Sequence, residues 1–74
     1  MRALQFKIAL ETLTLKEWDR WGTRDQKHII NVAEDNKLRI WVDKEFDEII
    51  FEGKPQNLYF FMTDLSFRYD IELI

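Results

Sequence analysis

Cysteine is absent from these 74 residues, and there are only two glycines and one proline. Without cysteine the chain can form no disulfide, supply no thiolate nucleophile and ligate no iron–sulfur cluster. The scarcity of glycine and proline argues against linkers and disordered segments. The sequence therefore predicts a single domain over residues 1–74, whose small core depends on good packing or on a partner.

Long hydrophobic runs and an excess of basic charge are also missing. Residues 1–7 alternate polar and apolar side chains, so we expect neither a signal peptide nor a membrane span, and we expect a cytoplasmic protein. The net charge is −3, with both signs mixed along the chain. Because nucleic-acid-binding proteins usually carry a basic excess, this composition argues against nucleic acid as a partner.

Four stretches alternate apolar and polar residues with period two, which predicts half-buried strands. They cover residues 4–11, 38–43, 48–52 and 67–73. A loop over residues 44–47 joins the second and third of them into a hairpin with apolar pairs on its core face. One like-charge pair is its weak point. The expected pairs are Arg39–Glu52, Ile40–Phe51, Trp41–Ile50, Val42–Ile49 and Asp43–Glu48.

Residues 15–35 show the period of an amphipathic helix. Thr14 and Glu17 have the spacing of a capping box that would open it. A second interpretation divides the segment near Gly22 into two collinear helices, with Thr23 and Gln26 capping the second. A third makes residues 28–33 a strand.

The period changes again after Pro55, a residue that suits the first turn of a helix because its missing N–H has no partner there. Leu58, Phe61, Met62 and Leu65 follow the helical spacing i, i+3, i+4, i+7. We therefore predict a helix over residues 55–65, with Phe60 facing solvent. The alternative is a strand with Leu58, Phe60 and Met62 facing inward, which the aromatic content favours.

The resulting order, β-α-β-β-α-β, resembles the ferredoxin-like arrangement of two split βαβ units. The resemblance covers nearly the whole chain and rests on element order. It implies an α+β sandwich in which a four-stranded antiparallel sheet carries two helices on one face. The other face of the sheet stays open.

Enzymatic and ligand-binding families of this shape leave signatures that are missing here. Acylphosphatases place a glycine-containing loop with an arginine after the first strand, but residues 11–14 contain neither. Metal-carrying domains need a cysteine pair, and RNA-recognition motifs need aromatic and basic side chains on the two central strands. Cas2-type nucleases carry an acidic residue after the first strand, which Glu11 alone imitates.

His28 is the only histidine, and Asp25 lies one helical turn before it. A His–Asp pair performs catalysis only with a nucleophile or a metal, and the sequence shows no spacing typical of either. We therefore interpret His28 as a solvated helix residue. We expect no enzyme, no catalytic residue, no metal and no cofactor.

Aromatic side chains ringed by charges are typical of protein interfaces. In the predicted fold Trp41 and Ile50 lie side by side on the open sheet face, while Phe60, Tyr59 and Trp21 lie on or beside exposed helix surface. Pairing of two open faces would also give a homodimer. The candidate partner-binding residues are Trp21, Trp41, Asp43, Glu48, Ile50, Tyr59, Phe60, Arg68, Asp70 and Glu72.

Three hypotheses for the function follow. The first is a small non-catalytic protein-binding module, an inhibitor, adaptor or regulator, that acts on a host enzyme through an acidic and aromatic surface. Short acidic cysteine-free chains are common among phage and mobile-element proteins that disable a host enzyme. The second is a ligand-binding regulatory domain of the ACT-like type, whose glycine-bearing loop after the first strand is missing. The third is a nucleic-acid-binding protein or a small metal-dependent nuclease that uses Glu11.

Overall fold

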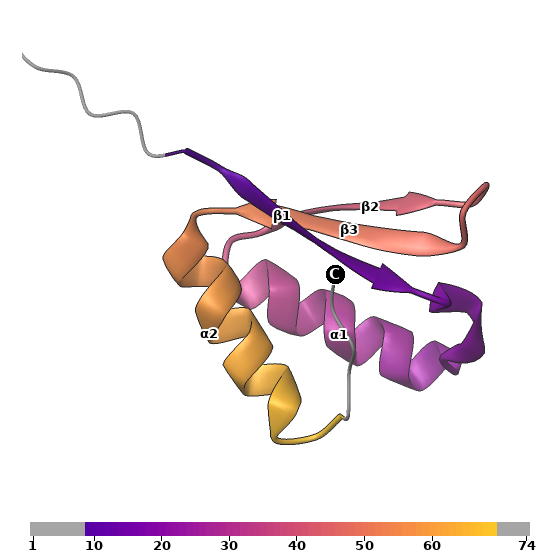
Figure 1. Ribbon diagram of the computed structural model, residues 1–74. Coiled ribbons are helices and arrows are strands. Elements are labelled where there is room, and N and C mark those ends of the chain that lie inside the picture. The colour runs from indigo at the N-terminus through magenta and orange to yellow at the C-terminus, as the bar shows by residue number, and fades with distance from the viewer. Residues whose placement is uncertain (1–8, 70–74) are drawn as a thin grey trace, which may run out of the picture.

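The computed structural model describes residues 9–69. They form two layers: an antiparallel sheet and two α-helices that lie against one face of it (Figure 1). The α+β class is therefore confirmed. The elements are β1 (Glu11–Lys16), the short 3-10 helix η1 (Trp18–Arg20), α1 (Thr23–Asp35), β2 (Arg39–Asp43), β3 (Glu48–Gly53) and α2 (Pro55–Ser66).

The predicted four-stranded ferredoxin-like sheet is wrong for the described residues, which form three strands in the order β1-β3-β2. The predicted first strand over residues 4–11 lies largely outside them, and β1 begins only at Glu11. A last strand was predicted over residues 67–73, but Phe67, Arg68 and Tyr69 are not in a strand. These residues turn after α2, because the N–H groups of Arg68 and Tyr69 both donate to the carbonyl of Leu65. Residues 70–74 lie outside the described part.

Residues 11–16 are a strand, although Leu15 and Lys16 were assigned to a helix. Leu13 and Leu15 face the core and alternate with Thr12 and Thr14, and β-branched threonines suit a strand. The predicted capping box does not form. Its second member, Glu17, adopts a left-handed conformation with φ of 56° and lies in the turn that follows β1.

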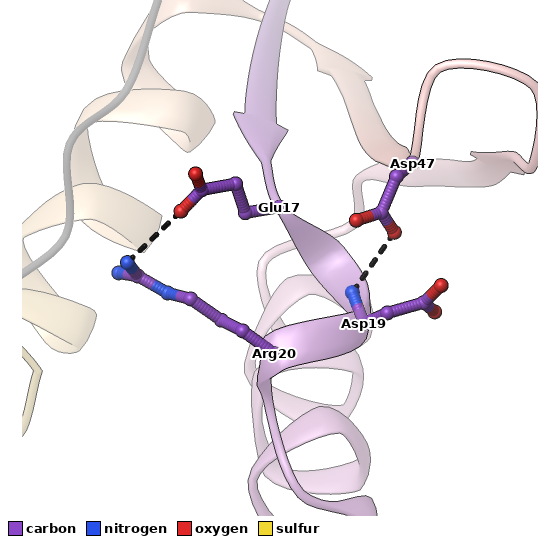
Figure 2. Close-up of polar contacts among 4 residues, drawn as sticks. All are labelled: Glu17, Asp19, Arg20 and Asp47. Carbon is purple, nitrogen blue, oxygen red and sulfur yellow. Dashed lines mark hydrogen bonds and ion pairs between the residues drawn. The ribbon is translucent and has the colours of Figure 1, made fainter.

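The turn after β1 is tied to the β2–β3 loop through Asp47 (Figure 2). The N–H of Trp18 donates to the carbonyl of Asp47 at 3.0 Å, and the N–H of Asp19 donates to its Oδ1 at 2.9 Å. Glu17 and Arg20 add an ion pair of 3.1 Å on the surface. Trp18 itself is buried in the core. The contact with Asp47 therefore fixes a chain segment that the sequence predicted to be helical.

The single helix over residues 15–35 is wrong, and the alternative with a break near Gly22 is correct only for the place of the break. The segment before Gly22 ends β1 and forms η1 instead of a first helix, and α1 begins at Thr23. Its cap differs from the prediction, since Gly22 occupies the N-cap position and no side chain caps the helix. The amide of Gln26 instead donates to the carbonyl of Trp18 at 3.0 Å. Residues 28–33 are helical, which rules out the alternative strand.

The β2–β3 hairpin has the predicted register at all five pairs. Ile49 and Phe51 are fully buried under the helices, as expected. Val42, on the same face, stays exposed because β2 is an edge strand. Gly53, at the end of β3, is buried where a Cβ would overlap a terminal methyl group of Leu38, so a larger residue there would displace the end of the Leu38 side chain.

The segment after Pro55 is a helix, as predicted, with proline in its first turn. Leu58, Phe61 and Leu65 are buried, and the ring of Phe61 packs on that of Phe51 with 4.6 Å between centroids. Phe60 faces solvent, which rules out the alternative strand. Met62, assigned to the apolar arc, lies at its edge and is exposed.

Candidate functional site

Four of the predicted partner-binding residues come together on the open face of the sheet. Trp41 and Ile50 are cross-strand partners, and Asp43 and Glu48 are partners in a neighbouring row of the same face. Trp41 is exposed and Ile50 is half-buried beside it. The hairpin register places these residues, because alternate positions of a strand project to the same side.

The open face has a short apolar centre between two charged rows. Arg39 and Glu52 form an ion pair across the hairpin, with 3.4 Å between Nη1 and Oε1. Lys16 lies opposite Glu48 on β1, so the face carries both signs and is not uniformly acidic. The three cross-strand rows are Thr12–Glu52–Arg39, Thr14–Ile50–Trp41 and Lys16–Glu48–Asp43.

Tyr59 and Phe60 lie on a different surface, the outward side of α2. Tyr59 is 65% exposed and Phe60 45% exposed, and their rings meet edge to face with 5.9 Å between centroids. Phe67, which continues the turn of α2 at its C-cap, is 84% exposed. It lies seven residues, or about two helical turns, after Phe60 and so projects to the same side. We call Tyr59, Phe60 and Phe67 the aromatic face of α2.

The aromatic face is nearly free of charge. Asp64 is the only charged residue among the twelve of α2, whereas 34% of the whole chain is charged. The hydroxyl of Thr63 donates to the carbonyl of Tyr59 at 2.9 Å, so it is satisfied within the helix. The sequence pattern predicts the exposure of Tyr59 and Phe60 but places Phe67 on the core side of a strand, so its position on this surface was not predicted.

Trp21 and Arg68 both contact Tyr69; Trp21 is half-buried, whereas Arg68 stays exposed. The rings of Trp21 and Tyr69 meet edge to face at 5.2 Å, and the guanidinium of Arg68 lies 5.9 Å from the ring of Tyr69. Trp21 is partly buried, and its Nε1 finds no hydrogen-bond partner within the described residues. The other two predicted residues, Asp70 and Glu72, lie outside the described part of the chain.

Asp25 accepts a hydrogen bond of 3.1 Å from the hydroxyl of Tyr69. Asp25, one helical turn before His28, thus contacts Tyr69, whose ring lies 5.9 Å from that of His28. Burial raises the pKa of Tyr69, and the hydrogen bond and charge of Asp25 raise it further. The cluster joins the start of α1 to the turn after α2, which is a structural role.

Tyr69→Phe should reduce the free energy of unfolding by about 1 kcal/mol at neutral pH, the usual net worth of one hydrogen bond. Because the folded protein holds the phenolic proton more tightly than the unfolded chain, this contribution is fully present below the ordinary pKa of 10.0 and is lost as pH rises through the raised pKa. Urea unfolding of both proteins from pH 7 to pH 11 tests this. A difference that grows with alkaline pH would contradict it.

The described residues offer no cluster of metal ligands. Between residues 9 and 69 there is no group of three or more acidic or histidine side chains that could hold a metal ion. Glu11 stands at the start of β1 and not after it. A shallow hollow on α1 is open to solvent and lined by Thr23, Arg24, Lys27, His28 and Asn31. In that same stretch of chain, no helix has the length and apolar character to cross a bilayer.

Comparison with known proteins found no matching family model, no matching curated protein and no matching solved structure. The function has to be argued from the surfaces of the chain itself.

Proposed function

We propose that this protein is a small non-catalytic protein-binding module that docks through the aromatic face of α2. The observation that carries the proposal is the exposure of Tyr59, Phe60 and Phe67 on one side of a single helix. Aromatic side chains are enriched among the residues that dominate binding energy at protein interfaces. They bury large areas there at a low cost in conformational entropy, since each has few rotatable bonds.

Packing against the core does not explain the aromatic residues on the outward side of α2. A helix that covers one face of a sheet buries one stripe and normally carries charged residues on its outward side. Here the buried stripe is complete with Leu58, Phe61 and Leu65, yet the outward side carries two large aromatic residues, Tyr59 and Phe60. This surface is suited to an apolar groove on another protein, the mode in which a helix lays one face into a hydrophobic channel.

Inhibition of a host enzyme by a phage or mobile-element protein is the specific role we propose within this class. Its support is the acidic balance of the chain together with the exposed aromatic residues of α2. The partner surface would be apolar at its centre, because α2 presents no cation and only Asp64 as an anion. Salt should therefore weaken the complex only slightly, in contrast to binding that rests on charge complementarity.

Phe60→Ser should weaken binding to the partner about 30-fold or more, the loss expected for a residue that dominates an interface. The partner is first captured on the full chain from cells that express it naturally, and is then purified. Isothermal titration calorimetry gives the dissociation constants. Tyr59→Ser should lower affinity in the same direction.

Phe46→Ser is the matched control, because Phe46 is an exposed phenylalanine of the β2–β3 loop, outside the aromatic face. It should leave the affinity within twofold. Circular dichroism checks that all variants remain folded, as exposed positions allow. Equal affinity of the wild type and the Phe60→Ser variant would reject the aromatic face as the docking surface.

A further inference from the structure

In the described part of the chain, β2 forms one edge of the sheet. Within residues 9–69 β2 pairs with β3 alone. Trp41 on the open face is 41% exposed, and Val42 on the helix face is 46% exposed. Proteins usually protect an edge strand with proline, a bulge or central charges, because its free N–H and C=O groups accept another strand. The centre of β2, Ile40-Trp41-Val42, has none of these.

The sequence of β2 is complementary to itself. Arg39 and Asp43 are opposite charges at its two ends, with Trp41 at the centre. If two copies pair antiparallel around a two-fold axis at Trp41, Arg39 of each lies opposite Asp43 of the other. Ile40 then lies opposite Val42, and Trp41 opposite Trp41. Every pair joins apolar with apolar or plus with minus, the combinations that stabilise neighbouring strands.

The other edge, β1, lacks this property. Its end residues Glu11 and Lys16 also have opposite charges. They are five positions apart, however, so pairing them would set a helix-face side chain opposite an open-face one. That register cannot occur in one continuous sheet, because residues directly opposite each other on neighbouring strands must project to the same face. Self-pairing therefore favours β2 over β1.

Pairing through β2 also relieves a repulsion within the hairpin. Asp43 lies opposite Glu48, a like-charge pair. Oδ1 of Asp43 accepts hydrogen bonds from the N–H groups of Glu45 and Phe46, which shapes the loop. Its second oxygen is left for the guanidinium of Arg39 from the second copy. The row Thr14–Ile50–Trp41 would then continue into the same row of that copy.

We propose that the protein forms a homodimer in which two β2 strands pair antiparallel around Trp41 to make one continuous six-stranded sheet. This interface is separate from the aromatic face of α2 and does not depend on the proposed function. Five residues from each copy make a small contact, so the dimer should be weak and depend on concentration.

Sedimentation equilibrium of the full chain, from micromolar to millimolar concentration, should show a monomer–dimer equilibrium. Arg39→Asp should shift it to monomer, because it sets two aspartates opposite each other at both ends. Asp43→Arg should do the same with two arginines. A one-to-one mixture of these variants should dimerise again, because each end then joins aspartate with arginine. A wild type that stays monomeric, or variants that each dimerise alone as well as the wild type, would overturn the proposal.

Single cysteines test the axis without altering these charges, because the chain has no other cysteine. Trp41→Cys sets two thiols directly opposite each other at the axis, within reach of a disulfide. Mild oxidation should link most of this variant into a dimer. Thr12→Cys, exposed on the β1 edge, is the matched control and should remain largely monomeric. Equal linking of both variants would overturn the β2 register even if charge variants fail to fold.

Discussion

Phe61→Ala is expected to lower the free energy of unfolding by about 3–5 kcal/mol, the usual cost of removing a buried phenylalanine. The side chain of Phe61 is fully buried and packs against Phe51, with the rings tilted by 47°, across the interface between α2 and the sheet. Small domains are stable by only about 5–15 kcal/mol. The substitution would therefore remove a large part of the total stability. Urea unfolding followed by tryptophan fluorescence and circular dichroism measures the change.

Phe60→Ala is the matched control for that variant, since it makes the same chemical change one residue earlier. Phe60 is exposed, so its removal should cost less than about 1 kcal/mol, as for most surface substitutions. The two variants also distinguish the helix from a strand over residues 55–65. A strand would bury Phe60, and the larger loss would then fall on Phe60→Ala.

Trp18→Ala is the second substitution with a large expected effect, again about 3–5 kcal/mol. Trp18 is 5% exposed, and its side chain fills the core at the turn between β1 and α1. The backbone N–H of the same residue donates to the carbonyl of Asp47. Removal of the side chain leaves a cavity where η1 meets the hairpin loop. Thermal and urea unfolding of the variant should show one cooperative transition at lower temperature and lower denaturant concentration.

Trp41→Ala serves as the tryptophan control, measured on dilute protein so that self-association does not contribute. Trp41 lies exposed on the open face, and its loss should cost much less than that of Trp18. If both variants unfold at the same urea concentration, Trp18 does not anchor the turn. The segment before Gly22 would then need a different description.

The β2–β3 hairpin could be predicted in full because two independent patterns agreed. Both strands alternate apolar and polar residues, and a four-residue loop joins them. Only one register then pairs apolar residues with apolar residues, and the structure shows that register. The helix after Pro55 could be predicted for a similar reason. Pro55 and the helical spacing of the apolar residues after it both predicted that the helix begins at this position. The change of period from two residues to a helical spacing separated it from β3.

The first strand was missed because short segments fit two periods at once. Leu15 and Trp18 lie three residues apart, which fits a helix, while Leu13 and Leu15 alternate only once, which is a weak strand signal. The decisive contact is that of Trp18 and Asp19 with Asp47, 28 or more residues away. Local pattern contains no information on such a contact, so tertiary structure overrides helix propensity here.

The candidate surface residues were predicted correctly where the elements that carry them were predicted correctly. The exposure of Phe60 and the pairing of Trp41 with Ile50 followed from elements that were predicted correctly. The role of Trp21 could not be predicted, because it depends on Tyr69 returning from the far end of the chain to pack against α1. The exposure of Phe67 was not predicted, because the residue was assigned to the core side of a strand.

Photo-cross-linking from position 60 tests the central claim most directly. Phe60 is replaced by the photoreactive aromatic p-benzoylphenylalanine, which keeps the aromatic ring, and the protein is irradiated in the cells that naturally express it. The account predicts a covalent adduct with another protein from position 60 and none from the same replacement at Phe46. No adduct from position 60, or the same adduct in equal yield from both positions, would contradict it.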